Sequence, residues 1–312
     1  MNPKTTARLP LILMLALAAV SLQAEIVALK DGLVVDTEQG IAYTMRPKGG
    51  IAALSLDSGT EIWRSLQADQ PLAVEDGRIV AMVDQPLAGF ISLRALDVVT
   101  GEAVESISLE VDAQVQAQVD DSLAHRFRIV TDSPHNPDTI AWRYQYLPPR
   151  GMPEATNEPS LRREQLGAFR VASSTGEFTT LSSPPEGIFA AGPAPETRAA
   201  DPALEGRRFA SQDGRHMLVV NLRNGADFRR YQWVVFDAGG SEVMRTDHFI
   251  AFAPFVVAGN RLLVTEPSHS FEDDSGNLVE FGLRLVAYAL ADGAERWSQP
   301  LRDTEYRGPF PW

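Results

Sequence analysis

The chain has 312 residues, of which 44% are hydrophobic and none is cysteine, and its formal net charge is −13 at pH 7. A chain this acidic repels the phosphates of nucleic acids and the headgroups of anionic lipids, so neither is an expected partner. Because there is no cysteine there is no disulfide, and the stability of the fold must come from its hydrophobic core.

The N-terminal segment, residues 1–24, has the pattern of a secretory signal peptide. Lys4 and Arg8 precede an apolar run over residues 9–20, and Ala24 ends the segment just before the first acidic residue. The run is too short to span a bilayer, which takes about 20 residues. We therefore expect cleavage after residue 24 and a periplasmic or secreted mature chain with no transmembrane segment. Retention of the segment as a membrane anchor is the alternative.

Two segments, LSLDSGTEIW (residues 54–63) and YALADGAERW (residues 288–297), repeat one pattern. In both, large apolar residues alternate with smaller ones up to a turn that contains Gly59 or Gly293, and Trp63 or Trp297 follows four residues later. Alternation with period two predicts a strand, and glycine takes the positive φ of a tight turn without steric cost. Each copy therefore predicts a β-hairpin whose tryptophan, on the return strand, covers a neighbouring sheet.

Three weaker copies, which lack the tryptophan four residues after the turn glycine, lie between these two. They span residues 95–105, 170–180 and 233–243, with turn glycines Gly101, Gly176 and Gly239, and with Glu105 and Thr180 at the tryptophan position of the first two. The glycines are separated by steps of 42, 75, 63 and 54 residues. A hairpin that recurs at about this spacing is typical of radially arranged sheets.

The pattern small-x-small-x-x-x-Gly-x-x-x-Trp resembles the repeat of the PQQ-like, or quinoprotein-type, β-propeller family, in which the tryptophan docks one blade on the next. The resemblance implies an all-β fold, a β-propeller of about five to seven four-stranded antiparallel blades closed into a ring. It would form a single domain over residues 25–312, with residues 25–35 able to pair with the C-terminal strand. The Asp-box of sialidase-type propellers matches less well, because its aromatic residue follows glycine by three positions.

Residues 148–206 are rich in proline, alanine and glutamate, and they predict long exposed loops on both sides of the hairpin at 170–180. A strand pattern resumes on either side, as in residues 139–147 (TIAWRYQYL). The segment is therefore expected to lie within the domain and not to link two domains.

The resemblance also raises an enzymatic function. Quinoprotein dehydrogenases hold PQQ at the centre of the propeller beside a Ca²⁺ ion with carboxylate and amide ligands and an Asp base. No residue of this chain can be matched to those ligands or to the base, and the vicinal disulfide of many such enzymes is excluded by the lack of cysteine. We assign no catalytic, cofactor-binding or metal-binding residue. The other branch of the family consists of non-enzymatic scaffold propellers of envelope assembly.

Several other groups of residues were considered as sites, each with a simpler structural interpretation. The first group could supply oxygen ligands for Ca²⁺ and consists of Glu272, Asp273, Asp274 and Asn277. Their spacing lacks the alternation of ligands in an EF-hand loop. A hairpin with its tip at residues 275–277 accounts for this polar segment more simply. The five histidines have no ligand spacing: His125, His135, His216, His248 and His269. Residues 211–215 (SQDGR) predict a structural turn.

Five aromatic residues lie in strand patterns where they could form a platform for stacking on a sugar. Their alternation with other residues instead favours a place in the core between blades. These residues are Trp142, Tyr144, Tyr146, Tyr231 and Trp233.

From all these patterns we expect an exported, soluble, monomeric β-propeller that binds or scaffolds a protein or an envelope component, without catalysis and without a cofactor. A divergent PQQ- and Ca²⁺-dependent oxidoreductase and a glycan-binding propeller are the alternatives.

Overall fold

The computed structural model describes residues 26–83, 90–110, 125–134, 137–146, 164–172, 177–189, 206–224, 229–272 and 275–302. The expected signal peptide, Gly176, His135, Asp273 and Asp274 lie outside these residues. Within them the secondary structure is entirely β, as the alternating sequence predicts, and every strand pairs antiparallel with its neighbour.

The strands form five sheets, each with its strands in chain order, and one separate hairpin. The first sheet contains β1 (Ile26–Lys30), β2 (Leu33–Asp36), β3 (Ile41–Met45), β4 (Ile51–Ser55) and β5 (Glu61–Ser65). The second contains β6 (Gln70–Glu75), β7 (Arg78–Val83), β8 (Phe90–Asp97) and β9 (Ala103–Glu110). The third contains β10 (His125–Thr131), β11 (Thr139–Tyr146), β12 (Glu164–Ala172) and β13 (Glu177–Leu181).

The fourth sheet contains β14 (Arg207–Ala210), β15 (Met217–Asn224), β16 (Arg229–Phe236) and β17 (Glu242–His248). The fifth contains β18 (Phe255–Ala258), β19 (Arg261–Glu266), β22 (Arg284–Ala289) and β23 (Glu295–Pro300). Between β19 and β22 the chain forms the separate hairpin of β20 (His269–Glu272) and β21 (Leu278–Phe281). Four sheets thus have the four strands expected of a blade, and the first has one more.

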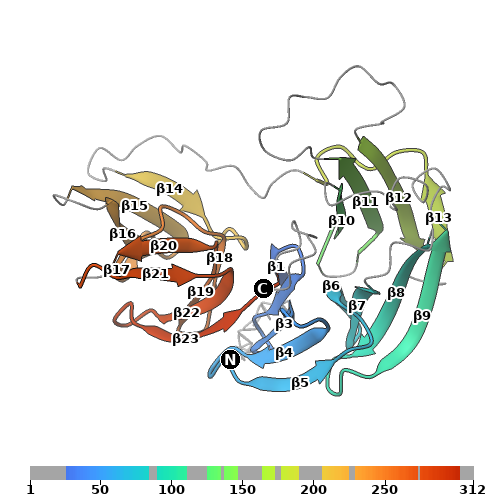
Figure 1. Cartoon of the computed structure of the whole chain (residues 1–312), viewed down its shortest axis with the longest axis horizontal. Helices are drawn as coiled ribbons and strands as arrows, with labels where there is room; N and C mark the ends of the chain where they lie inside the picture. The colour runs from blue at the N-terminus through green and yellow to red at the C-terminus, as the bar shows by residue number, and fades with distance from the viewer. Residues whose placement is uncertain are drawn as a thin grey trace, which may run out of the picture.

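The sheets follow one another along an arc in the order third, second, first, fifth, fourth (Figure 1). Core clusters are shared by the first and fifth sheets, by the first and second, and by the fourth and fifth. The third sheet is joined to the second by hydrogen bonds, among them one from the Gln70 side chain to the carbonyl oxygen of Ile129 at 3.2 Å. The first and last described strands, β1 and β23, therefore belong to the two sheets in the middle of the arc.

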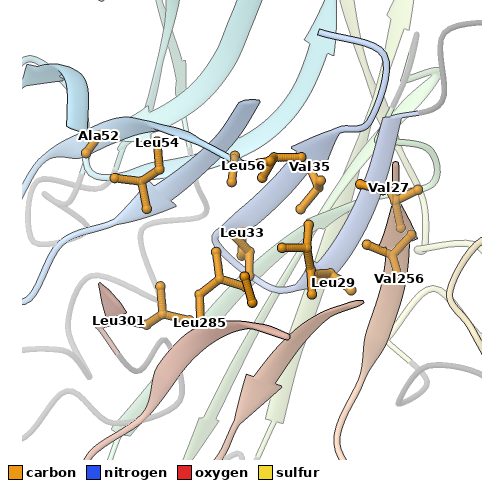
Figure 2. Close-up of a cluster of buried hydrophobic side chains, with 14 residues drawn as sticks. Val27, Leu29, Leu33, Val35, Ala52, Leu54, Leu56, Val256, Leu285 and Leu301 are labelled. Atoms are coloured by element: carbon orange, nitrogen blue, oxygen red, sulfur yellow. The ribbon is translucent and has the colours of Figure 1, made fainter. Parts of the chain in front are cut away.

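Of these three clusters, the one between the first and fifth sheets contains the most fully buried residues (Figure 2). Leu33 of the first sheet lies next to Leu285 of the fifth, Leu29 lies beside Leu33, and Leu301 lies beside Leu285 at the lower left of this view. All four side chains are buried. Burial of apolar surface at about 25 cal/mol per Å² makes such an interface a main source of stability in a fold without disulfides.

The closed ring that the resemblance implies is not found in the described part of the chain. The third and fourth sheets stand at opposite ends of the arc (Figure 1). The free face of the third sheet is already covered by its own chain, because Ile188 and Phe189, which follow β13, pack on Val130, Ala141 and Ala168. Part of this face is therefore occupied by the chain's own segment and is not available to the fourth sheet.

The expected pairing of residues 25–35 with the C-terminal strand is wrong. β1 pairs with β2, with Ile26 opposite Asp36, and β23 pairs with β22. β1 is instead the extra, innermost strand of the first sheet, where it lies against β6 of the second sheet and β18 of the fifth. The first and fifth sheets are joined by side-chain packing, which needs no shared strand.

Candidate functional site

The tryptophan of each strong repeat contacts the hairpin turn of the next sheet. The indole Nε1 of Trp63, on β5, donates a hydrogen bond to the carbonyl oxygen of Val98 at 2.9 Å. The ring lies against Gly101, whose φ is +73°, so closely that a Cβ there would sit 2.5 Å from the ring. Glycine is therefore required at this turn both for its backbone conformation and for the space it leaves.

Trp297 repeats this contact between the fifth and first sheets. Its Nε1 donates to the carbonyl oxygen of Leu56 at 3.0 Å, and a Cβ on Gly59, which has a φ of +68°, would lie 2.6 Å from the ring. The docking role that the resemblance implies for the repeat tryptophan is thus found at both strong copies.

Only one of the weaker copies, that of the fourth sheet, reaches the same kind of contact among the described residues, and it does so with another residue. A Cβ on Gly293 of the fifth sheet would meet Thr246 of β17 at 2.6 Å, so threonine takes the place of the indole here. The turn glycine of the fourth sheet is Gly240, with a φ of +80°; Gly239, which the sequence analysis assigned, does not have a positive φ. At the other tryptophan positions Glu105 is exposed and pairs with Arg78, and Thr180 is exposed.

The densest group of buried titratable side chains lies between the fourth and fifth sheets. Glu266 ends β19, Arg284 begins β22 directly opposite it, and Tyr288 lies further along β22. His248 ends β17 and stacks on Trp233, with ring centroids 4.0 Å apart and an interplanar angle of 6°. Glu266 is 0% exposed and His248 8% exposed, so water has little access to the group.

Hydrogen bonds connect every member of this group. His248 Nε2 lies 3.0 Å from Glu266 Oε1 and 2.9 Å from the Tyr288 hydroxyl, which also donates to Glu266 Oε1. Arg284 Nε donates to Glu266 Oε2 at 2.9 Å, and its Nη2 lies 2.7 Å from the same oxygen. Both carboxylate oxygens of Glu266 are therefore satisfied, as a buried charge requires.

The tautomer of His248 follows from its second nitrogen. Nδ1 accepts a hydrogen bond from the backbone N–H of Ile250 at 3.0 Å. An accepting nitrogen carries no proton, so the single ring proton of the neutral imidazole is on Nε2, where it donates toward Glu266 and Tyr288. The positive charge that balances Glu266 is that of Arg284.

The pKa values in this group are shifted in opposite directions. Burial opposes ionisation of Glu266, but hydrogen bonds from His248 and Tyr288 and electrostatic attraction from His248 and Arg284 outweigh it and lower its pKa from 4.5 to about 2. Burial raises the pKa of Tyr288 well above its ordinary value, and the charge of Glu266 adds to the effect. Glu266 is therefore an anion and Tyr288 a neutral donor at neutral pH.

Such an arrangement joins two sheets, and both oxygens of Glu266 already accept hydrogen bonds from described residues. Sequence reasoning missed it. His248 was considered only as an isolated histidine, and Glu266 and Arg284, separated by 18 residues with a hairpin between them, were not considered. The available signal was a carboxylate at the end of the apolar run RLLVTE, which predicts a buried or paired acid.

A second ion pair connects the third sheet to the first across the inner side of the arc. Arg128 of β10 donates through Nε and, at 2.9 Å, through Nη2 to the two carboxylate oxygens of Asp31, which lies in the turn after β1. Its Nη1 donates to the carbonyl oxygen of Phe189 at 3.0 Å. This bidentate pair holds the inner strand of the third sheet and the segment that covers it to the first sheet.

The turn at residues 211–215 is structural, as expected. Ser211 Oγ donates to Asp213 and accepts from the backbone N–H of His216 at 2.9 Å, and Gly214 has a φ of +69°. These bonds close the turn between β14 and β15, together with a backbone hydrogen bond from the N–H of Ser211 to the carbonyl oxygen of His216 at 2.8 Å.

The aromatic residues belong to the core where the structure describes their side chains. Trp142 and Trp233 are buried, and Tyr231 is half-buried against the core of the fourth and fifth sheets. The side chains of Tyr144 and Tyr146 on β11 lie outside the description. Trp142 and Trp233 are therefore not available to stack on a sugar.

The acidic segment around residue 275 forms the expected hairpin, with β20 paired to β21. Within the described part of the chain, no three His, Cys, Asp or Glu side chains come together in a way that could hold a metal ion. Two of the candidate Ca²⁺ ligands, Asp273 and Asp274, lie outside that part. Among the residues that the structure describes, no helix is long and apolar enough to cross a membrane.

No protein-family model matches the sequence, and no curated protein sequence matches it significantly. Several solved structures are similar at low TM-score. BamB from Moraxella catarrhalis matches with 13% identity and a TM-score of 0.26, over 87% of this chain and 64% of BamB, so this chain spans less than two thirds of its length. The β-propeller domain of Cps50 (Swd1) from Myceliophteria thermophila matches with 9% identity and a TM-score of 0.27, over 88% and 87% of the two chains.

The quinohemoprotein alcohol dehydrogenase ADHIIG from Pseudomonas putida HK5 also matches, with 12% identity and a TM-score of 0.21, over 84% of this chain and 57% of the enzyme. Quinohemoprotein and β-propeller structures are thus among those to which this chain is similar.

Proposed function

We propose that this chain is an exported, monomeric binding or scaffold module whose partner is a protein or a component of the cell envelope. Its sheets would form one β-propeller-like domain from residue 25 onward, after removal of residues 1–24. The side chains that the structure describes at the sheet interfaces hold the arc together, and they would keep the surface elements that bind the partner in fixed positions.

The observation that carries this proposal is how the buried polar groups are used. Glu266, His248, Tyr288 and Arg284 are the densest titratable group among the described residues, and each is bonded to another member. The repeat tryptophans likewise contact turns of neighbouring sheets. Because these groups form their hydrogen bonds between sheets, they support a rigid framework. The partner would then be bound by elements outside this framework, such as the β20–β21 hairpin.

The proposal is tested by immobilising the purified mature chain and exposing it to a detergent-solubilised envelope fraction. We expect one partner to be retained, and the same partner, once purified, to bind in a saturable manner in a calorimetric titration. Failure of every retained protein to bind when purified would contradict the proposal.

The oxidoreductase alternative is tested in parallel with PQQ and Ca²⁺. A ligand that binds only the folded state raises the melting temperature by mass action. A rise in melting temperature together with a change in quinone absorbance would favour the alternative. We expect neither change.

A further inference from the structure

The third sheet stands at one end of the arc, and one of its faces has no other sheet packed on it in the described part of the chain (Figure 1). This terminal face contains Val130, Ala141 and Ala168, which lie opposite one another on β10, β11 and β12 and form a row across the sheet. At the junctions between sheets, buried apolar residues of this kind are covered by the neighbouring sheet. Here the cover is a short segment of the same chain, residues 184–189, which we call the strap.

The strap is held by side chains and takes no part in strand pairing. Ile188 and Phe189 pack on the row and are themselves only half-buried. Arg128 Nη1 donates to the carbonyl oxygen of Phe189 at 3.0 Å, and the guanidinium of Arg143 lies 5.2 Å from the centroid of the Phe189 ring. Because no strand pairing involves the strap, its release would leave the backbone hydrogen bonds of the third sheet intact.

The strap leaves part of the terminal face exposed. Leu166 lies opposite Arg143, two residues from Ala168 and so on the same face, and it is 48% exposed. Arg170, two residues beyond Ala168 on this face, is exposed as well. Among the side chains that the structure describes on β11 and β12, the charged ones are Arg143 and Arg170. An apolar surface bordered by arginines, in a chain with a net charge of −13, favours an acidic partner over a basic one.

We propose that the terminal face binds an extended segment of a partner protein with an acidic residue close to an aliphatic–aromatic pair, and that the strap occupies this site in the free chain. The inference rests on the proposed binding function and names a surface and a partner chemistry for it. The strap shows what the face accepts, because Ile188 and Phe189 fill it and Glu186 precedes them. A partner segment that also covers Leu166 would bury more apolar surface than the strap and would displace it.

The experiment offers the strap to the face as a free peptide. The probe is a fluorescein-labelled, C-terminally amidated peptide with the sequence of residues 182–189, SSPPEGIF, and its binding to the full mature chain is measured by fluorescence anisotropy. In the double variant Ile188→Ser with Phe189→Ser, the strap no longer fills the face. We expect saturable binding to this variant and about tenfold weaker binding to the original chain, where the strap competes at a high effective concentration. A peptide with the same two serine substitutions should not bind.

Further variants place the binding on the terminal face. Arg143→Gln, added to the double variant, should weaken peptide binding about fivefold, because a cation–π contact is lost. Arg78→Gln is the matched control, because Arg78 is an exposed arginine of the second sheet that pairs with Glu105, and it should leave the affinity unchanged. Phe189→Ala alone should give an affinity between those of the original chain and the double variant. Melting temperatures check folding, and Phe189→Ala decides the test if the double variant does not fold.

Failure of the peptide to bind a folded strap variant, or equal affinity for the original chain and the variants, would overturn the inference and make the strap a permanent cover. The envelope partner separates this inference from the proposed function. The double variant should retain more of that partner than the original chain, and the free peptide should release it. If both chains retain the partner equally and the peptide does not release it, the binding function stands and the terminal face is not its site.

Discussion

Trp297 donates a hydrogen bond from its indole nitrogen to the carbonyl oxygen of Leu56, 3.0 Å away and 241 residues earlier in the chain. The contact joins the last sheet of the chain to the first and places the ring against Gly59. Trp63 makes the same contact with Val98 and Gly101. The two repeats are therefore alike in tertiary role as well as in sequence, and each connects its own sheet to the next one along the arc.

Trp297→Ala should lower the free energy of unfolding by about 3 kcal/mol, because it removes a large, partly buried ring from the interface of the first and fifth sheets. Trp297→Phe keeps an aromatic ring but loses the N–H donor, and should cost about 1 kcal/mol. Urea denaturation measures both. The neighbouring Arg296→Ala, which removes an exposed side chain paired with Asp292, should leave the urea midpoint nearly unchanged. Equal midpoints for Trp297→Ala and Arg296→Ala would contradict the role of the indole.

Alanine substitutions at two glycines with positive φ distinguish two contributions to the loss of unfolding free energy, backbone strain and steric overlap. Gly59 and Gly240 have φ values of +68° and +80°, but a Cβ meets the Trp297 ring at 2.6 Å only at Gly59 and has nothing within 4 Å at Gly240. Gly240→Ala should cost about 1 kcal/mol from backbone strain. Gly59→Ala should cost about 3 kcal/mol, because overpacking adds to the strain. If urea denaturation gives the same loss for both, the ring does not restrict residue 59.

Glu266→Gln should change how the free energy of unfolding depends on pH. A carboxyl whose pKa is lowered from 4.5 to about 2 on folding stabilises the folded state above pH 4.5, and this contribution is lost as the pH falls from 4.5 toward 2. At pH 7 the variant should be less stable by about 3 kcal/mol, since Arg284 is left without its buried partner.

The difference in unfolding free energy between the original chain and Glu266→Gln should therefore shrink as the pH is lowered from 5 to 2. Glu295→Gln is the matched control, because Glu295 pairs with the same arginine at 3.4 Å but is 40% exposed. Its effect should be small and nearly independent of pH over this range. A constant difference for Glu266→Gln across the range would show that Glu266 is not held as a buried anion.

Asp31→Asn should loosen the third sheet without unfolding the rest of the arc. The bidentate bond to Arg128 is lost, and with it the charge that holds β10 and the Phe189 segment to the first sheet. Amide hydrogen exchange should become faster in β10 and β11 and stay unchanged in β19 and β22. Glu105→Gln, which removes an exposed pair with Arg78, should leave both regions unchanged. Equal acceleration in all the sheets would mean that Asp31 acts on global stability.

The hairpins were predictable because their determinants are local. Alternation of large and small side chains sets the strand faces, and the glycines at 59, 101 and 293 all have the positive φ that the turn pattern requires. At the fourth sheet the prediction missed by one residue. Two adjacent glycines stand there, and their order along the chain does not show which of them, Gly239 or Gly240, has the positive φ.

The buried polar group was not predictable in the same way. Glu266 and Arg284 face each other because β19 and β22 are adjacent strands, although a hairpin separates them in the chain. His248 reaches Glu266 only because the fourth sheet packs on the fifth. No spacing in the sequence encodes either relationship.

By itself the sequence determined that the fold is built of β-hairpins, and that glycine and tryptophan recur where sheets meet, because strand period and turn conformation depend on neighbouring residues. Only the tertiary structure decided the order of the sheets, the placement of β1 inside the first sheet and the opening between the third and fourth sheets. These three features depend on which apolar faces of the sheets pack together. Ile188 and Phe189, for example, pack on one face of the third sheet, and no pattern in the neighbouring sequence predicts that they do so.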